Sequence, residues 1–114
     1  MEESTAVETI SSVEQKIIEA QVNEVLRSCY DPEIPVNIYE LGLIYGVKVD
    51  EKAEVTITMT LTTPHCPAAQ SLPHEIGTKT KAIPRVSKVV VDVVWTPQWN
   101  PSMMSEAARL ELGM

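Results

Sequence analysis

Apolar residues at helical spacing mark the first element of the chain. Four of them follow one another at steps of four, three and four, so they share one helix face: Ile18, Val22, Val25 and Cys29. Ser12 is suited to the N-cap of this helix. The two prolines of "DPEIP" disfavour helical backbone around them, so we expect the helix to end near Tyr30.

Alternation of apolar and polar residues marks two strands in the middle of the chain. In "AEVTITMTLTT" the threonines face one way and four apolar residues the other: Val55, Ile57, Met59 and Leu61. The run before it, "LIYGVKV", is also predicted to be a strand. The segment that leads into this strand, "ELGLIYG", is expected to supply three core residues: Leu41, Leu43 and Ile44. A short polar turn, "DEKA", joins the two runs. The sequence therefore predicts an antiparallel hairpin.

A helix and a third strand follow the hairpin. Residues 66–82 are predicted to be helical, with an apolar stripe of Ala69, Leu72, Ile76 and Ile83, and with a kink or a break near Leu72 because of Pro73. "RVSKVVVDVVW" reads as a strand whose last residue, Trp95, we expect in the core. A helix between two strands implies a parallel pair. A short C-terminal helix closed by Gly113 completes the chain.

These elements predict a small two-layer α/β (α+β) domain. The order is α-β-β-α-β plus a C-terminal helix, around a mixed three-stranded sheet. We expect residues 1–12 to form a flexible tail and residues 13–114 to form a single domain, as 114 residues allow.

Charge and composition exclude several classes of protein. The formal net charge of −7 argues against nucleic acid as the main partner. The acidic N-terminal stretch lacks the pattern of a secretory signal, and no run of apolar residues reaches the length of a membrane span. We therefore expect a cytoplasmic protein that binds neither nucleic acid nor membrane, with two free thiols.

Cys66 is the main candidate for chemistry. It precedes Pro67, which suits the first position of a helix, so Cys66 is the predicted N-cap. Free backbone N–H groups and the helix dipole stabilise a thiolate there, the form that attacks electrophiles and binds soft metals. Cys29 instead continues an apolar stripe and is expected in the core. For His65 and His74 we expect solvated surface positions. The spacing of the cysteines and histidines matches no structural zinc site, and neither histidine is placed to contact Cys66 as the histidine of a cysteine hydrolase would be.

Other polar residues near these motifs have ordinary explanations. On the residues alone, Asp31 is expected to cap a proline-stiffened turn and Glu33 to be solvated. Thr62 fits a strand by β-propensity as well as it fits a hydrogen bond to the sulfur of Cys66. Trp99 could flank a pocket or form a partner surface.

Three motifs together resemble one known family. "DPEI…LGLIY", "LTTPHCP" and "W-x-P-x-W…MSEAA-x-x-x-LG" occur in the order and spacing of the iron–sulfur assembly family that contains SufT and the PaaD-like proteins. The similarity runs from about Val13 to the C-terminus. It implies an α/β fold and a functional site of five residues, with Cys66 as the reactive or ligating sulfur: Asp31, Glu33, Thr62, Thr63 and Cys66. His65 departs from the family, whose members commonly have a glycine or another small residue there.

The resemblance implies an accessory factor in iron–sulfur cluster assembly or delivery, not an enzyme. A single thiolate suits transient holding of a cluster, so the expected partners are an iron–sulfur scaffold and client apo-proteins. A homodimer that brings two Cys66 thiolates together is a further hypothesis. Two alternatives stay open: a non-catalytic adaptor or subunit that binds partners without holding a cluster, and a thiol enzyme with Asp31 as the base.

Overall fold

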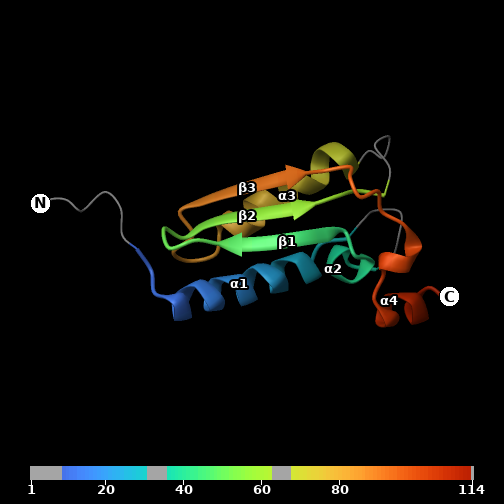
Figure 1. The fold of residues 1–114 in the computed structure, drawn as a ribbon, viewed down its shortest axis with the longest axis horizontal. Coiled ribbons are helices and arrows are strands. Elements are labelled where there is room, and N and C mark those ends of the chain that lie inside the picture. Colours follow the sequence, from blue (N-terminus) through green and yellow to red (C-terminus); the bar gives the residue numbers. More distant parts are fainter. Residues whose placement is uncertain (1–8, 31–35, 63–67, 114) are drawn as a thin grey trace, which may run out of the picture.

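The computed structural model describes residues 9–30, 36–62 and 68–113 of the chain. Along the chain the elements are α1 (Ser12–Arg27), α2 (Ile38–Leu41), β1 (Ile44–Val49), β2 (Glu54–Met59), α3 (Ala68–Lys81), β3 (Lys88–Val93), a 3-10 turn η2 (Pro101–Met103) and α4 (Glu106–Glu111). Figure 1 shows α3 behind the sheet, α1 below it, and α2 and α4 together at one end. The predicted small α/β architecture is confirmed.

The three strands form one mixed sheet in the order β1-β2-β3. β1 and β2 are antiparallel, as the predicted hairpin requires, and Ile44 is opposite Met59. β2 and β3 are parallel, as predicted for strands joined by a helix, and Met59 is opposite Val93. The beginning of β1 and the ends of β2 and β3 therefore lie at the same end of the sheet.

The core lies between the sheet and the two long helices, because α1 packs on β1, α3 packs on β3, and the two helices contact each other. The four apolar residues predicted to face one way from the second strand are all buried: Val55, Ile57, Met59 and Leu61. Val90, on the opposite face, is 42% exposed. One face of the sheet is thus packed and the other largely open, as antiparallel hairpins commonly allow.

Helix α1 begins at Ser12, one residue earlier than a cap at Ser12 would allow. Ser11, not Ser12, is the N-cap, and with Glu14 it forms a capping box in which each side chain accepts the other residue's backbone N–H. The helix ends at Arg27 with Ser28 as its cap, three residues short of the expected Tyr30. Buried Leu26 belongs to the apolar face, on which Val25 is only half-buried.

Contacts of the folded chain begin before α1. Ile10 is buried, and its backbone N–H donates to the carbonyl of Glu51 over 2.7 Å. Residue 10 therefore already contacts the folded part of the chain. The expected boundary between a tail (residues 1–12) and a domain (residues 13–114) stays a prediction.

We expected a kink or a break near Leu72. Helix α3 is continuous through Pro73, so the break is wrong, while the kink stays a prediction. A proline this close to the start of a helix removes one backbone hydrogen bond and leaves most of the ladder intact. Leu72 and Ile76, on either side of it, are fully or almost fully buried. Their burial stabilises the helix by several kcal/mol, roughly 1.5–3 for each side chain, which offsets the cost of the proline.

Two further differences concern the segments around the sheet. The four-residue helix α2 was not predicted; it is capped by Asn37, whose side chain accepts the N–H of Glu40. The expected core position of Trp95 is wrong, because this side chain is 43% exposed, whereas Trp99 packs against the core.

The C-terminal prediction is confirmed. Helix α4 is present and is followed by Gly113 with a φ of +75°. Within the described residues, no helix combines the length and the apolar character that crossing a membrane requires.

Candidate functional site

The described parts of the three sequence motifs meet at the end of the sheet where β1 begins and β2 and β3 end. We call this the motif end. The "DPEI…LGLIY" motif leads into β1, the "LTTPHCP" motif leaves β2, and the C-terminal motif leaves β3. Backbone hydrogen bonds join these segments: Thr60 N–H donates to Leu43 over 2.8 Å, and Val94 N–H donates to Met59 over 2.8 Å. The topology of the mixed sheet therefore brings together segments that are far apart in the sequence.

Aromatic side chains fasten the C-terminal segment across the motif end. Trp99 Nε1–H donates to the carbonyl of Leu41 over 2.7 Å. The hydroxyl of Tyr45 donates to the carbonyl of Pro97 over 2.6 Å and lies 3.7 Å from Met103 Sδ. These bonds explain why Trp99, and not Trp95, is the tryptophan that packs inward, because its N–H finds an acceptor there.

Gly42 is the closest meeting point of the first and third motifs. It has a φ of +82°, in the left-handed region that favours glycine, and it ends α2. A Cβ at this position would collide with the backbone carbonyl group of Met103. Next to it, Ser105 N–H donates to the carbonyl of Glu40 over 2.9 Å. The glycine of "LGLIY" is thus required both by its own conformation and by the approach of the C-terminal segment.

Of the five site residues implied by the resemblance, the structure describes Thr62 alone. It is half-buried, beyond the end of β2. Four of them lie outside the described residues, as does His65: Asp31, Glu33, Thr63 and Cys66. The predicted N-cap role of Cys66 is therefore untested. Of the described flanks, Tyr30 and Asn37 on either side of residues 31–35 form an isolated antiparallel bridge outside the sheet, and β2 ends at Met59 before residues 63–67.

Sequence reasoning missed Thr60 as a candidate. Its side chain is fully buried just after the end of β2, and its Oγ1 has no hydrogen-bond partner among the residues that the structure describes. An unpaired buried hydroxyl costs roughly 1–3 kcal/mol, so a native position that keeps one calls for an explanation. Only the alternation of threonines along the strand hinted at it, since that pattern places Thr60 and Thr62 on one face.

Cys29 occupies the core position predicted for it. It is fully buried, and its thiol lies 3.4 Å from the carbonyl of Val25. Burial raises the pKa of the Cys29 thiol above its ordinary value, the nearby Glu75 carboxylate raises it further, and Lys79 acts in the opposite direction. This sulfur is therefore kept as a neutral thiol, the unreactive form. His74 is exposed, as expected.

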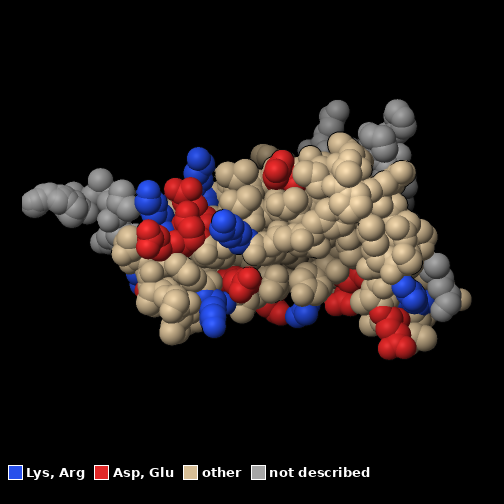
Figure 2. Space-filling model, in the orientation of Figure 1, with Lys and Arg blue, Asp and Glu red and all other residues tan. Residues whose placement is uncertain are grey.

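Charge is distributed unevenly between the two ends of the sheet. Figure 2 shows charged side chains gathered near the β1–β2 turn, whereas the surface toward the other end is uncharged over a wide area apart from α4. Residues 93–105 contain no charged residue. Among the residues that the structure describes, no group of three or more His, Cys, Asp or Glu side chains is placed to hold a metal ion.

Comparison with known families decides the relationship. The family model described as "Iron-sulfur cluster assembly protein" matches residues 19–93. The chain belongs to this family. The match spans the core of the fold from α1 to the end of β3.

Individual relatives of the iron–sulfur cluster assembly family agree with this assignment. A protein of Porphyromonas gingivalis named "Fe-S protein maturation auxiliary factor" is 50% identical over 95 residues, which cover 83% of this chain and 90% of that protein. The Staphylococcus aureus protein named "Fe-S protein maturation auxiliary factor SufT" is 38% identical over 84 residues, covering 74% and 96%. The predicted membership of the SufT-like family is confirmed.

A solved structure extends the similarity to three dimensions. A domain of unknown function from Bacillus anthracis superposes with a TM-score of 0.83 at 34% sequence identity, covering 91% of this chain and 99% of that one. Nearly the whole fold is therefore shared.

Proposed function

We propose that the protein is an accessory factor in iron–sulfur cluster assembly or delivery, with Cys66 as its functional thiolate and the cluster as its cargo. The observation that carries the proposal is the convergence of the three motif-bearing segments at the motif end. Family membership and the names of the relatives, which describe maturation of Fe-S proteins, support it.

The chemistry of the residues is consistent with temporary holding. Thiolates are the usual ligands of iron–sulfur clusters, and one thiolate from one chain leaves most coordination positions to other ligands. A cluster held in this way can be passed on to a client apo-protein. Hydroxyl groups of Thr62 and Thr63 would donate hydrogen bonds to sulfur, while Asp31 and Glu33 complete the polar surroundings. In this role the protein positions a cargo and catalyses no reaction.

Reconstitution under anaerobic conditions tests the proposal. Iron and sulfide are added to the purified protein, to Cys66→Ser and to the matched control Cys29→Ala, followed by visible absorption and iron counting. We expect a chromophore in the native protein and in the control but not in Cys66→Ser, because Cys29 is buried as a neutral thiol and is therefore not expected to hold a cluster. A chromophore that survives in Cys66→Ser would contradict the assignment of Cys66.

The same samples test the homodimer. If two Cys66 thiolates share one cluster, light scattering should give a dimer mass for the reconstituted native protein and a monomer mass for Cys66→Ser. A monomer both with and without cluster would rule out this arrangement.

The alternative function is that of an adaptor that binds partners without holding a cluster. The exposed Trp95 on an uncharged surface favours it, since exposed aromatic side chains often anchor protein interfaces. In that case no variant shows a chromophore, and Trp95→Ala should weaken binding to the iron–sulfur scaffold protein by roughly tenfold or more, while Cys66→Ser should not.

A further inference from the structure

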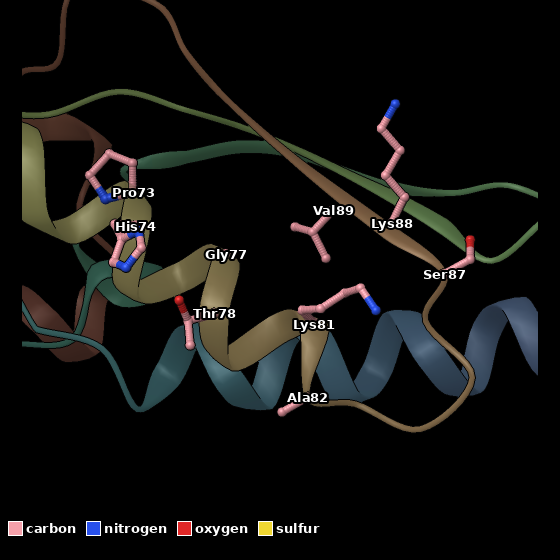
Figure 3. A pocket seen from close by; sticks show the side chains of 9 residues that line it. All are labelled: Pro73, His74, Gly77, Thr78, Lys81, Ala82, Ser87, Lys88 and Val89. Carbon is pink, nitrogen blue, oxygen red and sulfur yellow. The ribbon is translucent and has the colours of Figure 1, made fainter.

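An open groove runs between the second half of α3 and the beginning of β3, away from the motif end. It encloses about 760 Å³ and is lined by Pro73, His74, Gly77, Thr78, Lys81, Ala82, Ser87, Lys88 and Val89. Figure 3 shows Val89 pointing from the strand toward the helix, and the Lys81 side chain extending from the helix toward the Ser87 side of the groove. Lys88 lines the edge of the groove on β3, but its side chain points away from the helix (Figure 3).

Small residues keep the floor of this groove open. At Gly77 helix α3 lies close to β3, since a Cβ there would be 3.7 Å from Val91 Cγ2. Ala82 and Val89 continue the apolar floor, while hydroxyl groups of Thr78 and Ser87 lie at its margins. The groove thus combines an apolar floor with a polar and cationic border.

The charge of this region is opposite to that of the rest of the protein. Residues 76–91 contain four of the nine basic residues and none of the sixteen acidic ones, in a chain of net charge −7. Two of these cations are paired: Lys79 with Glu75 and Arg85 with Glu14, both at 2.9 Å. Lys81 and Lys88 make no ion pair with any residue in the described parts of the chain. Both are exposed, so their charges are accessible to a partner.

We propose that this groove binds a short acidic segment of a partner protein. A carboxylate of the partner would pair with Lys81, Lys88 would add attraction at the rim, and an apolar side chain would cover Gly77 and Val89. Complementary charge across an interface speeds association and selects the partner. The open shape favours a peptide over a small molecule, because pockets for small molecules enclose most of the ligand surface.

The position of the groove gives the proposal a functional meaning. Ser87 is tied to the β1–β2 turn through hydrogen bonds to the carbonyls of Lys52, at 2.7 Å, and Ala53, at 2.9 Å. The groove therefore opens toward the end of the sheet opposite the motif end. A partner held here would leave the motif end free, so docking and cluster chemistry would be separable.

Peptide selection tests the proposal directly. A random dodecapeptide library displayed on phage is panned on the full chain, and the most enriched peptide is labelled and its affinity measured by fluorescence anisotropy. We expect enrichment of peptides that combine Asp or Glu with apolar residues. Lys81→Glu should weaken binding at least tenfold and Lys81→Gln by about two- to fivefold, the range of an exposed ion pair.

The controls separate a groove from general attraction. Lys16→Glu changes the charge of an exposed lysine on α1 by the same amount and should alter affinity less than twofold. Cys66→Ser should not alter it, because the motif end takes no part. Enrichment without acidic residues, or equal weakening by Lys16→Glu and Lys81→Glu, would overturn the proposal. Competition by millimolar inorganic phosphate that disappears in Lys81→Glu would also overturn it, since it would indicate a simple anion site.

Discussion

The two ends of the sheet are built on different principles. At the motif end, side chains bond to carbonyls more than fifty residues away, as Trp99 does to Leu41 and Tyr45 to Pro97. At the opposite end, Asp50 organises its own turn by accepting the N–H groups of Lys52 and Glu54. The described surface of the first end carries little charge apart from α4 (Figure 2), and side-chain bonds spanning more than fifty residues assemble it. The second end is rich in charge, and its turn is organised locally by Asp50, although Ile10 and Ser87 also bond to it. Precise placement of the family motifs thus depends on long-range contacts.

Gly42→Ala should give the largest effect, because it disrupts the motif end at its tightest point. The new Cβ would collide with the carbonyl of Met103, in a left-handed conformation that disfavours alanine. We expect a loss of about 2–4 kcal/mol in the free energy of unfolding, measured with urea. Gly46→Ala is the control, because no atom lies within 4 Å of its new Cβ. Equal losses in both variants would contradict the special role of Gly42.

Trp99→Phe should have the next largest effect. It keeps an aromatic ring but removes the donor to the Leu41 carbonyl, and leaving that carbonyl unpaired costs roughly 1–3 kcal/mol. Trp95→Phe, at a more exposed position, should change the free energy of unfolding by less than about 0.5 kcal/mol. Thermal unfolding of both variants checks this difference. Equal losses of stability in Trp99→Phe and Trp95→Phe would contradict the role given to the Trp99 hydrogen bond.

Two buried threonines allow a direct comparison between the motif end and the rest of the core. Thr60 is at the motif end and Thr80 on α3, and neither Oγ1 has a hydrogen-bond partner within the described parts of the chain. Replacing either hydroxyl by the methyl group of valine should stabilise the protein by about 1 kcal/mol. If the site uses the hydroxyl of Thr60, then Thr60→Val alone should also reduce iron loading in the reconstitution assay. Unchanged loading in both variants would leave Thr60 without a functional role.

The smallest expected effect concerns Cys29 and pH. Its raised pKa means that the folded state keeps the proton when the unfolded state loses it, which begins near about 8.5. Stability is then fully present below that pH and falls as the pH rises toward the folded pKa. Urea unfolding of Cys66→Ser between pH 8 and 10.5 should show this decline, and Cys66→Ser with Cys29→Ala should show less of it.

Sequence patterns predicted most of the fold because its main elements are periodic and locally encoded. The alternation of Val55 and Ile57 with threonines was enough to place β2, and the helix between two strands was enough to predict their parallel pairing. The four-residue α2 was missed because one cap and tertiary contacts stabilise it, not its own length. Trp99 packs inward and Trp95 is exposed, contrary to the prediction for Trp95. The reason is that the carbonyl of Leu41 accepts the N–H of Trp99, a contact that no local sequence pattern reveals.

The candidate site was predictable in its motifs but not in its assembly. Periodicity and spacing say nothing of the contact between Gly42 and Met103, which only the folded chain creates. Thr62 is placed by the end of β2, and the remaining four residues stay predictions: Asp31, Glu33, Thr63 and Cys66.

The hydrogen bond from Trp99 to Leu41 also has a consequence for biosynthesis. Contacts between residues so far apart along the chain carry a high entropic cost of loop closure and form late in folding. During synthesis the hairpin and α1 emerge first, while α2 waits for residues 99–105 to close over it. A nascent chain would therefore have a sheet before it has a finished motif end, so under the proposed function it would hold no cluster before its C-terminal segment is made.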